Sequence, residues 1–228
     1  MISRKEQELK ELRQALVEMA LLVREMITEA VRGLVERRGE PLERVEALED
    51  TVNMAEVELD DRCVKFVALY QPEASDLRTV MMIMRMNSNL ERMGDHAFNI
   101  AREAKYLIRR PLVKPLVDTP RMAEVVVGML DDAVKAFTDR DEALARDICV
   151  RDQQVDALRD QIIRELLTYM LSDPSTIERA LKLMQVAQNL ERIGDLATNL
   201  AEDVVYMVTG KIIKHRLEFR QREDEEEG

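Results

Sequence analysis

The sequence contains few of the residues that build sheets, disulfide scaffolds or zinc sites. Among its 228 residues there is no Trp, only 7 are Gly and 2 are Cys, and aromatic residues make up 4%. This balance is typical of long helices rather than sheets. Cys63 and Cys149 have no second Cys or His at ligand spacing. We therefore expect an all-α protein whose cysteines are small, buried apolar residues in a reducing compartment.

Long apolar runs are absent as well. No window approaches the roughly eighteen uninterrupted apolar residues of a membrane span, and the first residues, MISRKEQELKELRQ, contain no apolar signal core. The formal net charge is −11, from 45 acidic and 34 basic side chains, and its field repels nucleic acid and anionic membrane surfaces. We expect a cytoplasmic protein that neither inserts into a membrane nor binds nucleic acid.

Apolar residues recur every three or four positions and predict six long helices in two groups of three. The first helix is expected over about 4–38, with Gly39 and Pro41 ending it. The others are expected over about 41–70, from residue 73 to about 109, over 120–138 and 141–171, and from the SDPS stretch to about 207. The segment RRPLVKPLVDTPR between the groups holds three prolines and is the predicted domain boundary.

A 13-residue motif occurs in the third helix of each group. The sequences NLERMGDHAFNIA at 89–101 and NLERIGDLATNLA at 189–201 share nine identical positions. Their separation far exceeds the roughly 20–50 residues of solenoid repeats, so the motif indicates a duplicated domain. We expect two tandem up-down three-helix bundles, over residues 1–110 and 118–210, followed by a charged tail at 211–228.

The motif places oxygen-bearing side chains four residues apart on the face opposite the predicted core. Like charges at this spacing destabilise a helix by about 0.2–0.5 kcal/mol each, which a bound cation would reverse. The alternative is a solvated polar face, neutralised by Arg92 and Arg192 and repeated only through common descent. The strip comprises Glu91, Asp95, Asn99 and Glu103 in the first bundle and Glu191, Asp195, Asn199 and Asp203 in the second.

A second pair of polar strips lies on the second helix of each group, at Glu49 and Asn53 and at Asp152 and Asp156. If these groups converge with the motif carboxylates, they form hard, oxygen-rich sites suited to magnesium, manganese or iron rather than zinc. The sequence does not fix the distance between the strips. It contains no Glu-x-x-His, no nucleophile and base pair and no phosphate-cradling loop, which argues against an enzyme.

Other residues of the motif region have structural interpretations. Gly94 and Gly194 lie in the middle of predicted helices, where glycine costs about 1 kcal/mol relative to alanine, and are expected to allow close helix–helix approach. His96 is expected to be solvent-exposed, with a secondary interpretation as an auxiliary metal ligand. The methionine-rich run at 80–86 indicates core filling first and an adaptable partner surface second.

The two 13-residue motifs, together with QPEASDLR at 71–78 and DQQVD at 152–156, resemble the PhoU family along essentially the whole chain. The resemblance implies a cytoplasmic negative regulator of phosphate uptake and phosphate-starvation signalling. Its partners would be the ATPase subunit of an ABC-type phosphate importer and a membrane sensor histidine kinase. The resemblance also implies metal ions at surface carboxylate motifs. The matching residues are Glu49, Glu91 and Asp95 in the first bundle and Asp152, Asp156, Glu191 and Asp195 in the second.

Asn53 departs from this metal-binding pattern, which prefers Asp. Its neutral amide removes one negative charge, so we expect weaker metal occupancy in the first bundle than in the second. Three functions remain open: a regulatory adaptor whose metal sites stabilise its contact faces, a metal-buffering or storage protein, and a purely structural helical scaffold. The long amphipathic faces of such bundles also favour a homodimer.

Overall fold

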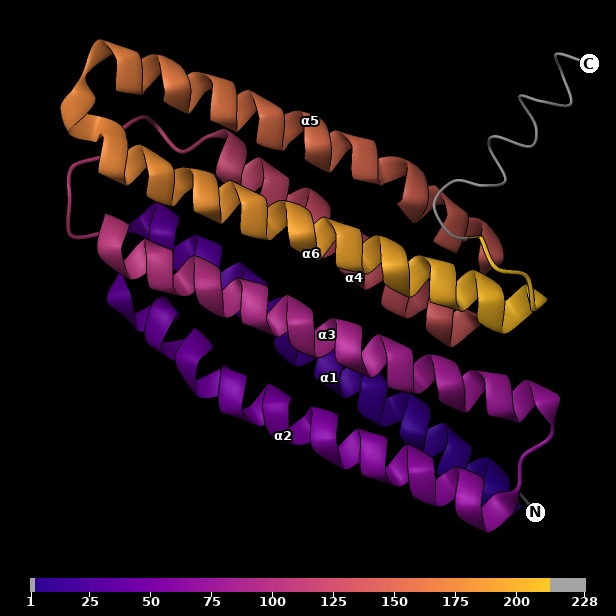
Figure 1. Cartoon of the computed structure of the whole chain (residues 1–228). Helices are drawn as coiled ribbons and strands as arrows, with labels where there is room; N and C mark the ends of the chain where they lie inside the picture. Colours follow the sequence, from indigo (N-terminus) through magenta and orange to yellow (C-terminus); the bar gives the residue numbers. More distant parts are fainter. Residues whose placement is uncertain (1–2, 214–228) are drawn as a thin grey trace, which may run out of the picture.

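The computed structural model describes residues 3–213 and contains no strand in that range (Figure 1). The predicted all-α fold of six long helices is confirmed, and the predicted tail at 211–228 lies outside the described residues from position 214 onward. None of the helices in residues 3–213 is long and apolar enough to cross a membrane. The helices are α1 (Arg4–Glu36), α2 (Gly39–Tyr70), α3 (Ala74–Leu107), α4 (Asp118–Asp139), α5 (Glu142–Ser172) and α6 (Ile177–Thr209), with a short 3-10 helix η1 (Pro174–Thr176).

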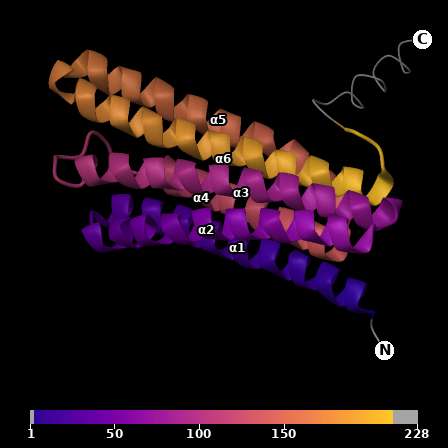
Figure 2. The same cartoon turned by 60° about the horizontal axis from the view of Figure 1, so that its bottom comes forward.

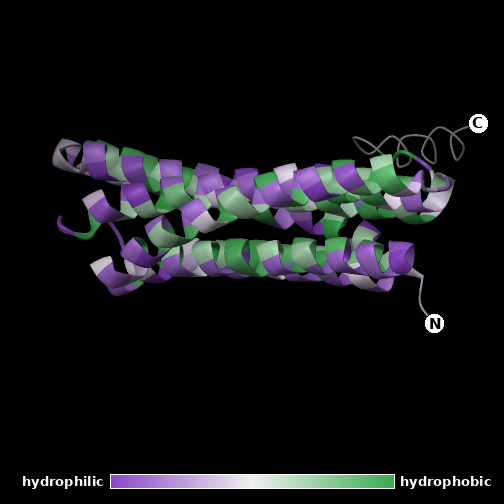
Figure 3. Ribbon diagram, turned by 90° about the horizontal axis from the view of Figure 1, so that it is seen from below, coloured by the Kyte–Doolittle hydropathy of each residue, from purple (hydrophilic) through white to green (hydrophobic). Residues whose placement is uncertain are grey.

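The helices form two three-helix bundles, α1–α3 and α4–α6, that pack against each other mainly through α3 and α6 and also through α1 and α4. Helices α3 and α6 run antiparallel and lie side by side in the middle of the molecule (Figures 1 and 2). Hydrophobic and hydrophilic residues are interspersed along the helices that are visible in Figure 3, as expected for amphipathic helices. The apolar sides of all six helices join in one continuous core that spans both bundles.

Polar side chains cap several helix starts. Ser3 and Glu6 form a capping box, in which the Ser3 hydroxyl accepts a hydrogen bond from the Glu6 N–H at 3.2 Å and the Glu6 carboxylate accepts one from the Ser3 N–H at 2.8 Å. Asp141 accepts a hydrogen bond from the first turn of α5. Asp173, in the SDPS stretch, accepts a hydrogen bond from the Ser175 N–H at 2.9 Å.

The turn between α1 and α2 differs from the prediction. Gly39 was expected to end the first helix, but it is the first residue of α2, and Arg37 takes the left-handed conformation with φ 58°. For a residue with a Cβ atom this conformation costs roughly 1–2 kcal/mol. The Arg37 guanidinium offsets that cost because it donates hydrogen bonds to the carbonyls of Ile108 and Arg110, at 2.7 and 2.6 Å, beyond the end of α3.

The proline-rich connection at 108–117 is anchored by a buried lysine. Lys114 is only 5% exposed, and its Nζ contacts the Glu165 carboxylate and lies 3.3 Å from the Asp118 carboxylate. The connection is also held from α6, where Arg179 donates to the Pro111 carbonyl at 2.9 Å. Ionic contacts to the second bundle therefore fix the course of the connection.

Both glycines of the repeated motif face the second helix of their bundle, and the predicted close helix packing is confirmed at Gly194. A Cβ atom on Gly94 would lie 3.4 Å from Val52 Cγ1 of α2. A Cβ atom on Gly194 would lie 3.2 Å from Val155 Cγ1 of α5, closer than most Cβ contacts. The absence of a side chain therefore matters for the approach of α6 to α5 at Gly194, whereas a Cβ atom at Gly94 would make only an ordinary van der Waals contact with α2.

Two members of the predicted outward strip are instead buried between the bundles. Glu103 is 6% exposed and binds Lys182 of α6 at 2.8 Å, and Asp203 is 1% exposed and binds Arg85 of α3 at 2.8 Å. The reason is helical geometry: at 3.6 residues per turn, a strip with four-residue steps rotates by about 120° over twelve residues. Glu103 and Asp203 therefore turn from the outer face into the contact between α3 and α6.

We expect the buried carboxylate of Asp203 to depend on Arg85. Arg85→Met should lower the free energy of unfolding by about 2–4 kcal/mol, because it leaves a desolvated carboxylate without its guanidinium. Arg85→Met with Asp203→Leu should recover most of the loss. Urea unfolding measures both, and Lys65→Met, which removes an exposed ion pair, is the control and should change stability by less than about 1 kcal/mol. Equal effects of Arg85→Met and the control would contradict this account.

Candidate functional site

The contacts of the two motif glycines show which residues of α2 and α5 occupy equivalent positions in the two bundles. Gly94 and Gly194 occupy the same place in the repeated motif, so Val52 and Val155, which pack against them, occupy equivalent positions on α2 and α5. Counting along the helices from these valines gives three further equivalent pairs: Glu49 with Asp152, Asn53 with Asp156, and Glu56 with Arg159.

In the first bundle, carboxylates of α2 and α3 gather into what we call the first acidic cluster, formed by Glu49, Glu56, Glu91 and Asp95. Burial, followed by the charge of Asp95, raises the pKa of Glu49 above its usual range. Burial, followed by the charges of Asp95 and Glu56, raises the pKa of Glu91. These carboxylates are therefore close enough to repel one another. None of the four forms an ion pair within residues 3–213.

In the second bundle, the four predicted ligands form the second acidic cluster: Asp152, Asp156, Glu191 and Asp195. Burial, followed by the charges of Glu191, Asp152 and Asp156, raises the pKa of Asp195 to about 6. The structure thus brings the α5 strip to the motif of α6. The distance between the strips, which the sequence left open, is short enough for mutual repulsion in both bundles.

A basic residue that sequence reasoning missed enters the second cluster. Arg159 Nη1 contacts the Glu191 carboxylate and lies 3.1 Å from Asp156 Oδ1, while its Nη2 lies 2.9 Å from Asp160 Oδ1. Its nearness also opposes the rise in the Asp195 pKa. Arg159 lies three residues after Asp156, and that spacing on one helix face was the signal available in the sequence.

The two clusters differ in how well they suit a metal ion. Within residues 3–213, no three His, Cys, Asp or Glu side chains are arranged so that they could hold a metal ion, so a cation would have to draw the carboxylates together. The first cluster has carboxylates that repel each other and have no ion pair, which fits a hard cation. In the second, Arg159 already binds two of the four carboxylates. The first cluster therefore fits such an ion better.

A polar hollow of about 430 Å³ lies along the contact between α3 and α6. The Arg, Asp and Asn that both copies of the motif share contribute to it from both sides. The repeated polar residues therefore line one common hollow between the bundles in addition to the separate clusters. Its lining residues are Arg92, Asp95, His96, Asn99, Arg192, Asp195, Leu196 and Asn199.

His96 was predicted to be solvent-exposed, and this was wrong. The imidazole is half-buried in the hollow, and its Nδ1 lies 2.9 Å from Asn189 Oδ1 of the opposite bundle. Burial is the main cause that lowers the pKa of His96. Because an amide oxygen only accepts hydrogen bonds, the ring donates its Nδ1–H to Asn189 Oδ1. His96 therefore joins α3 to α6.

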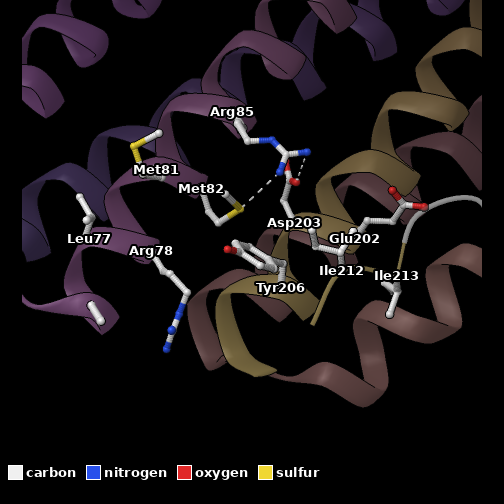
Figure 4. A pocket seen from close by; sticks show the side chains of 11 residues that line it. Leu77, Arg78, Met81, Met82, Arg85, Glu202, Asp203, Tyr206, Ile212 and Ile213 are labelled. Carbon is white, nitrogen blue, oxygen red and sulfur yellow. Dashed lines mark hydrogen bonds and ion pairs between the residues drawn. The ribbon is translucent and has the colours of Figure 1, made fainter. Parts of the chain in front are cut away.

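A second hollow, of about 570 Å³, lies where α3 begins and α6 ends (Figure 4). Its wall includes the Arg85–Asp203 ion pair and part of the methionine-rich run. Met82 is buried and Met81 is 45% exposed. Core filling is thus confirmed for Met82 and its buried neighbours Val80, Ile83 and Met86, and a partner surface stays a prediction for Met81.

The raised pKa of Asp195 has a measurable consequence. The pKa of Asp195 in the folded protein is about 6, above the ordinary value of 3.8. As pH falls from 6 toward 4, the folded protein therefore binds a proton at Asp195 before the unfolded chain does, and the free energy of unfolding of the wild type increases. Asp195→Asn should therefore be more stable than wild type at pH 7.5, by less than about 1 kcal/mol at this solvent-screened site. The difference should shrink by pH 4.5.

Urea unfolding at the two pH values measures this difference, with Asp139→Asn at the exposed end of α4 as the surface control. A loss of stability in Asp195→Asn at pH 7.5 would contradict the inferred repulsion.

Known proteins are similar to this chain in sequence along most of its length. A family model described as PhoU domain matches residues 16–104 and 119–204. The phosphate-specific transport system accessory protein PhoU homolog of Aquifex aeolicus (strain VF5) is 43% identical over 209 residues, covering 92% of this chain and 95% of the relative. The corresponding homolog of Pseudomonas aeruginosa is 35% identical over 220 residues, covering 96% and 91%.

Solved structures match over nearly their full length. The crystal structure of PhoU from Pseudomonas aeruginosa has a TM-score of 0.87 at 35% identity, covering 90% of this chain and 99% of that one. The crystal structure of the phosphate transport system regulatory protein PhoU from Streptococcus pneumoniae has a TM-score of 0.86 at 28% identity, covering 92% and 100%. With two domain matches, close relatives and the same fold, the chain belongs to the PhoU family.

Proposed function

We propose that this chain is a regulatory accessory protein of a phosphate transport system. The observation that carries the proposal is that two PhoU domains fill most of the chain, and that a relative named for this role is 43% identical over 92% of it. In this proposal the protein acts in the cytoplasm and holds phosphate uptake and the phosphate-starvation response off when phosphate is plentiful. It binds the ATPase subunit of the ABC-type importer and a sensor histidine kinase, and it catalyses no reaction itself.

The architecture suits an adaptor. Helices of 31–34 residues, such as α3 and α5, span roughly 45–50 Å at 1.5 Å per residue. Their packing in one continuous core makes a stiff platform, and α2 and α5 lie on opposite sides of the α3–α6 pair (Figure 1). Two partners can therefore be held at separate faces of the same molecule.

An apolar stripe on α2 is the first contact surface to test. Met54, Val57 and Val64 are 66%, 65% and 57% exposed, and their spacing places them on one side of the helix. Exposed apolar groups gathered in this way are typical of interaction sites. The equivalent positions on α5 are Ala157, Asp160 and Leu167.

Metal binding forms part of the proposal, with iron, manganese or magnesium as the candidate ions. When bound, the ion would neutralise the repulsion among the carboxylates and so stiffen the face on which they lie. Glu49, Glu91 and Asp95 would hold it in the first bundle. The four residues predicted in the second bundle would do so only in competition with Arg159.

The partner-binding proposal is tested by capture on the immobilised full chain. The wild type should retain the importer ATPase and the cytoplasmic part of the kinase. Val57→Glu with Val64→Glu should reduce capture of one of them by about tenfold, because two buried charges would enter the contact. Leu167→Glu, at the position on α5 equivalent to Val64, is the matched control.

A second test, in cells, measures phosphate uptake in phosphate-rich medium. Loss of the chain should raise uptake, and re-expression of the wild type should restore it. Failure to capture either partner, together with unchanged uptake after loss of the chain, would contradict the proposed function.

A further inference from the structure

The second hollow, of about 570 Å³ between the start of α3 and the end of α6, has walls that are mostly apolar. Among its lining residues, Leu77, Met81 and Ile212 are 38%, 45% and 67% exposed, and Met82 is buried. Sites for small molecules are usually concavities of roughly 300–1,000 Å³ with apolar walls and a few polar groups that fix the ligand. The second hollow therefore has the size and the walls of such a site, and its polar groups indicate the class of ligand.

The charged side chains around the second hollow differ in their partners. Arg85 is paired with Asp203 at 2.8 Å. Arg78 makes no ion pair or hydrogen bond within residues 3–213, and its Nε is buried without an acceptor. Figure 4 shows the Glu202 carboxylate on the far side of the hollow from the Arg78 guanidinium. The end of the hollow at Arg78 therefore has a positive charge with no paired carboxylate.

A tyrosine hydroxyl in the second hollow also has no partner. Tyr206 of α6 lines the hollow, and its hydroxyl makes no hydrogen bond within the part of the chain that the structure describes. In Figure 4 the ring lies between α3 and α6, with its hydroxyl on the side of Arg78. A guanidinium only donates hydrogen bonds and a phenol donates one, so a single carboxylate can accept from both side chains.

The duplicated fold contains the same arrangement with its carboxylate in place. Counting from the repeated motif, the end of α3 and the start of α6 form the equivalent contact, where Tyr106 corresponds to Tyr206 and Glu178 to Arg78. There the Tyr106 hydroxyl donates a hydrogen bond to the Glu178 carboxylate. In the second hollow a guanidinium replaces that carboxylate, and the tyrosine has lost its acceptor. The group that would complete the hollow is therefore a carboxylate.

We propose that the second hollow binds a small organic carboxylate with an apolar body. The carboxylate accepts hydrogen bonds from Arg78 and Tyr206, and its charge offsets that of the guanidinium. The apolar body lies along Leu77, Met81 and Met82 of α3 and removes their side chains from water. This site is separate from the two acidic clusters. The inference goes beyond the proposed function and does not depend on it.

The test is isothermal titration of the full chain with octanoate, and with 1-octanol as an uncharged probe that has the same number of carbon atoms. Octanoate should bind about tenfold more tightly than 1-octanol, because the carboxylate accepts charge-assisted hydrogen bonds. Arg78→Met should remove this difference, and Tyr206→Phe should weaken octanoate binding by about threefold. Arg121→Met, which removes an exposed arginine at the start of α4, is the matched control and should leave binding unchanged.

NMR of carbon-13-labelled methionine methyl groups locates the ligand. Octanoate should shift the signals of Met81 and Met82, which Met81→Leu and Met82→Leu assign, and should leave that of Met54 on α2. Circular dichroism checks that each variant is folded. If Arg78→Met does not fold, Tyr206→Phe decides the outcome.

Three results would overturn the inference: no octanoate binding, equal binding of octanoate and 1-octanol, or unchanged octanoate binding in Arg78→Met. Binding that appears only after removal of residues 214–228 would assign the hollow to the chain's own end, and binding that disappears as the chain self-associates would assign it to a second copy. Either result would also overturn the inference. Partner capture and phosphate uptake are measured separately, so failure of the proposed function is recognised independently.

Discussion

The antiparallel packing of α3 against α6 is the constraint on which the rest of the structure depends. Both helices carry the repeated motif, and their contact joins two three-helix bundles into one core. It buries Glu103 and Asp203, which bind Lys182 and Arg85 across the contact. It also places His96 against Asn189 and brings the shared Arg, Asp and Asn of both motifs around one hollow. The motif is therefore used twice at a single interface.

Duplication preserved the packing while the charges diverged. Gly94 and Gly194 keep the same contact with a valine, so the backbone positions of the two acidic clusters correspond. Within that common frame, Arg159 neutralises one cluster from inside the protein, whereas the carboxylates of the other repel each other.

Much of this fold follows from periodicity alone. Six helices were predicted with ends within a few residues of those observed, because long amphipathic segments separated by prolines leave little alternative. Details that depend on the packing of one helix against another were not predictable. The four-residue strip was expected to face outward along its whole length, but its slow rotation carries Glu103 and Asp203 into the interface. The half-buried environment of His96 depends on Asn189, a residue 93 positions away.

The sequence predicted which carboxylates gather, but it did not predict which of them pair with a basic side chain. The carboxylates at 49, 91 and 95 and at 152, 156, 191 and 195 do gather in two groups. What the sequence could not show is that a basic side chain on α5 reaches Glu191 of α6, because that requires the register between two helices.

Anomalous X-ray scattering from crystals of the wild-type protein grown with Mn²⁺ tests the central claim most directly, because it locates the ion and the arginine together. Our account gives an anomalous peak among Glu49, Glu91 and Asp95, with Arg159 still bound to Glu191 in the other bundle. A peak at Asp152, Asp156, Glu191 and Asp195 with Arg159 displaced, and none in the first bundle, would contradict it.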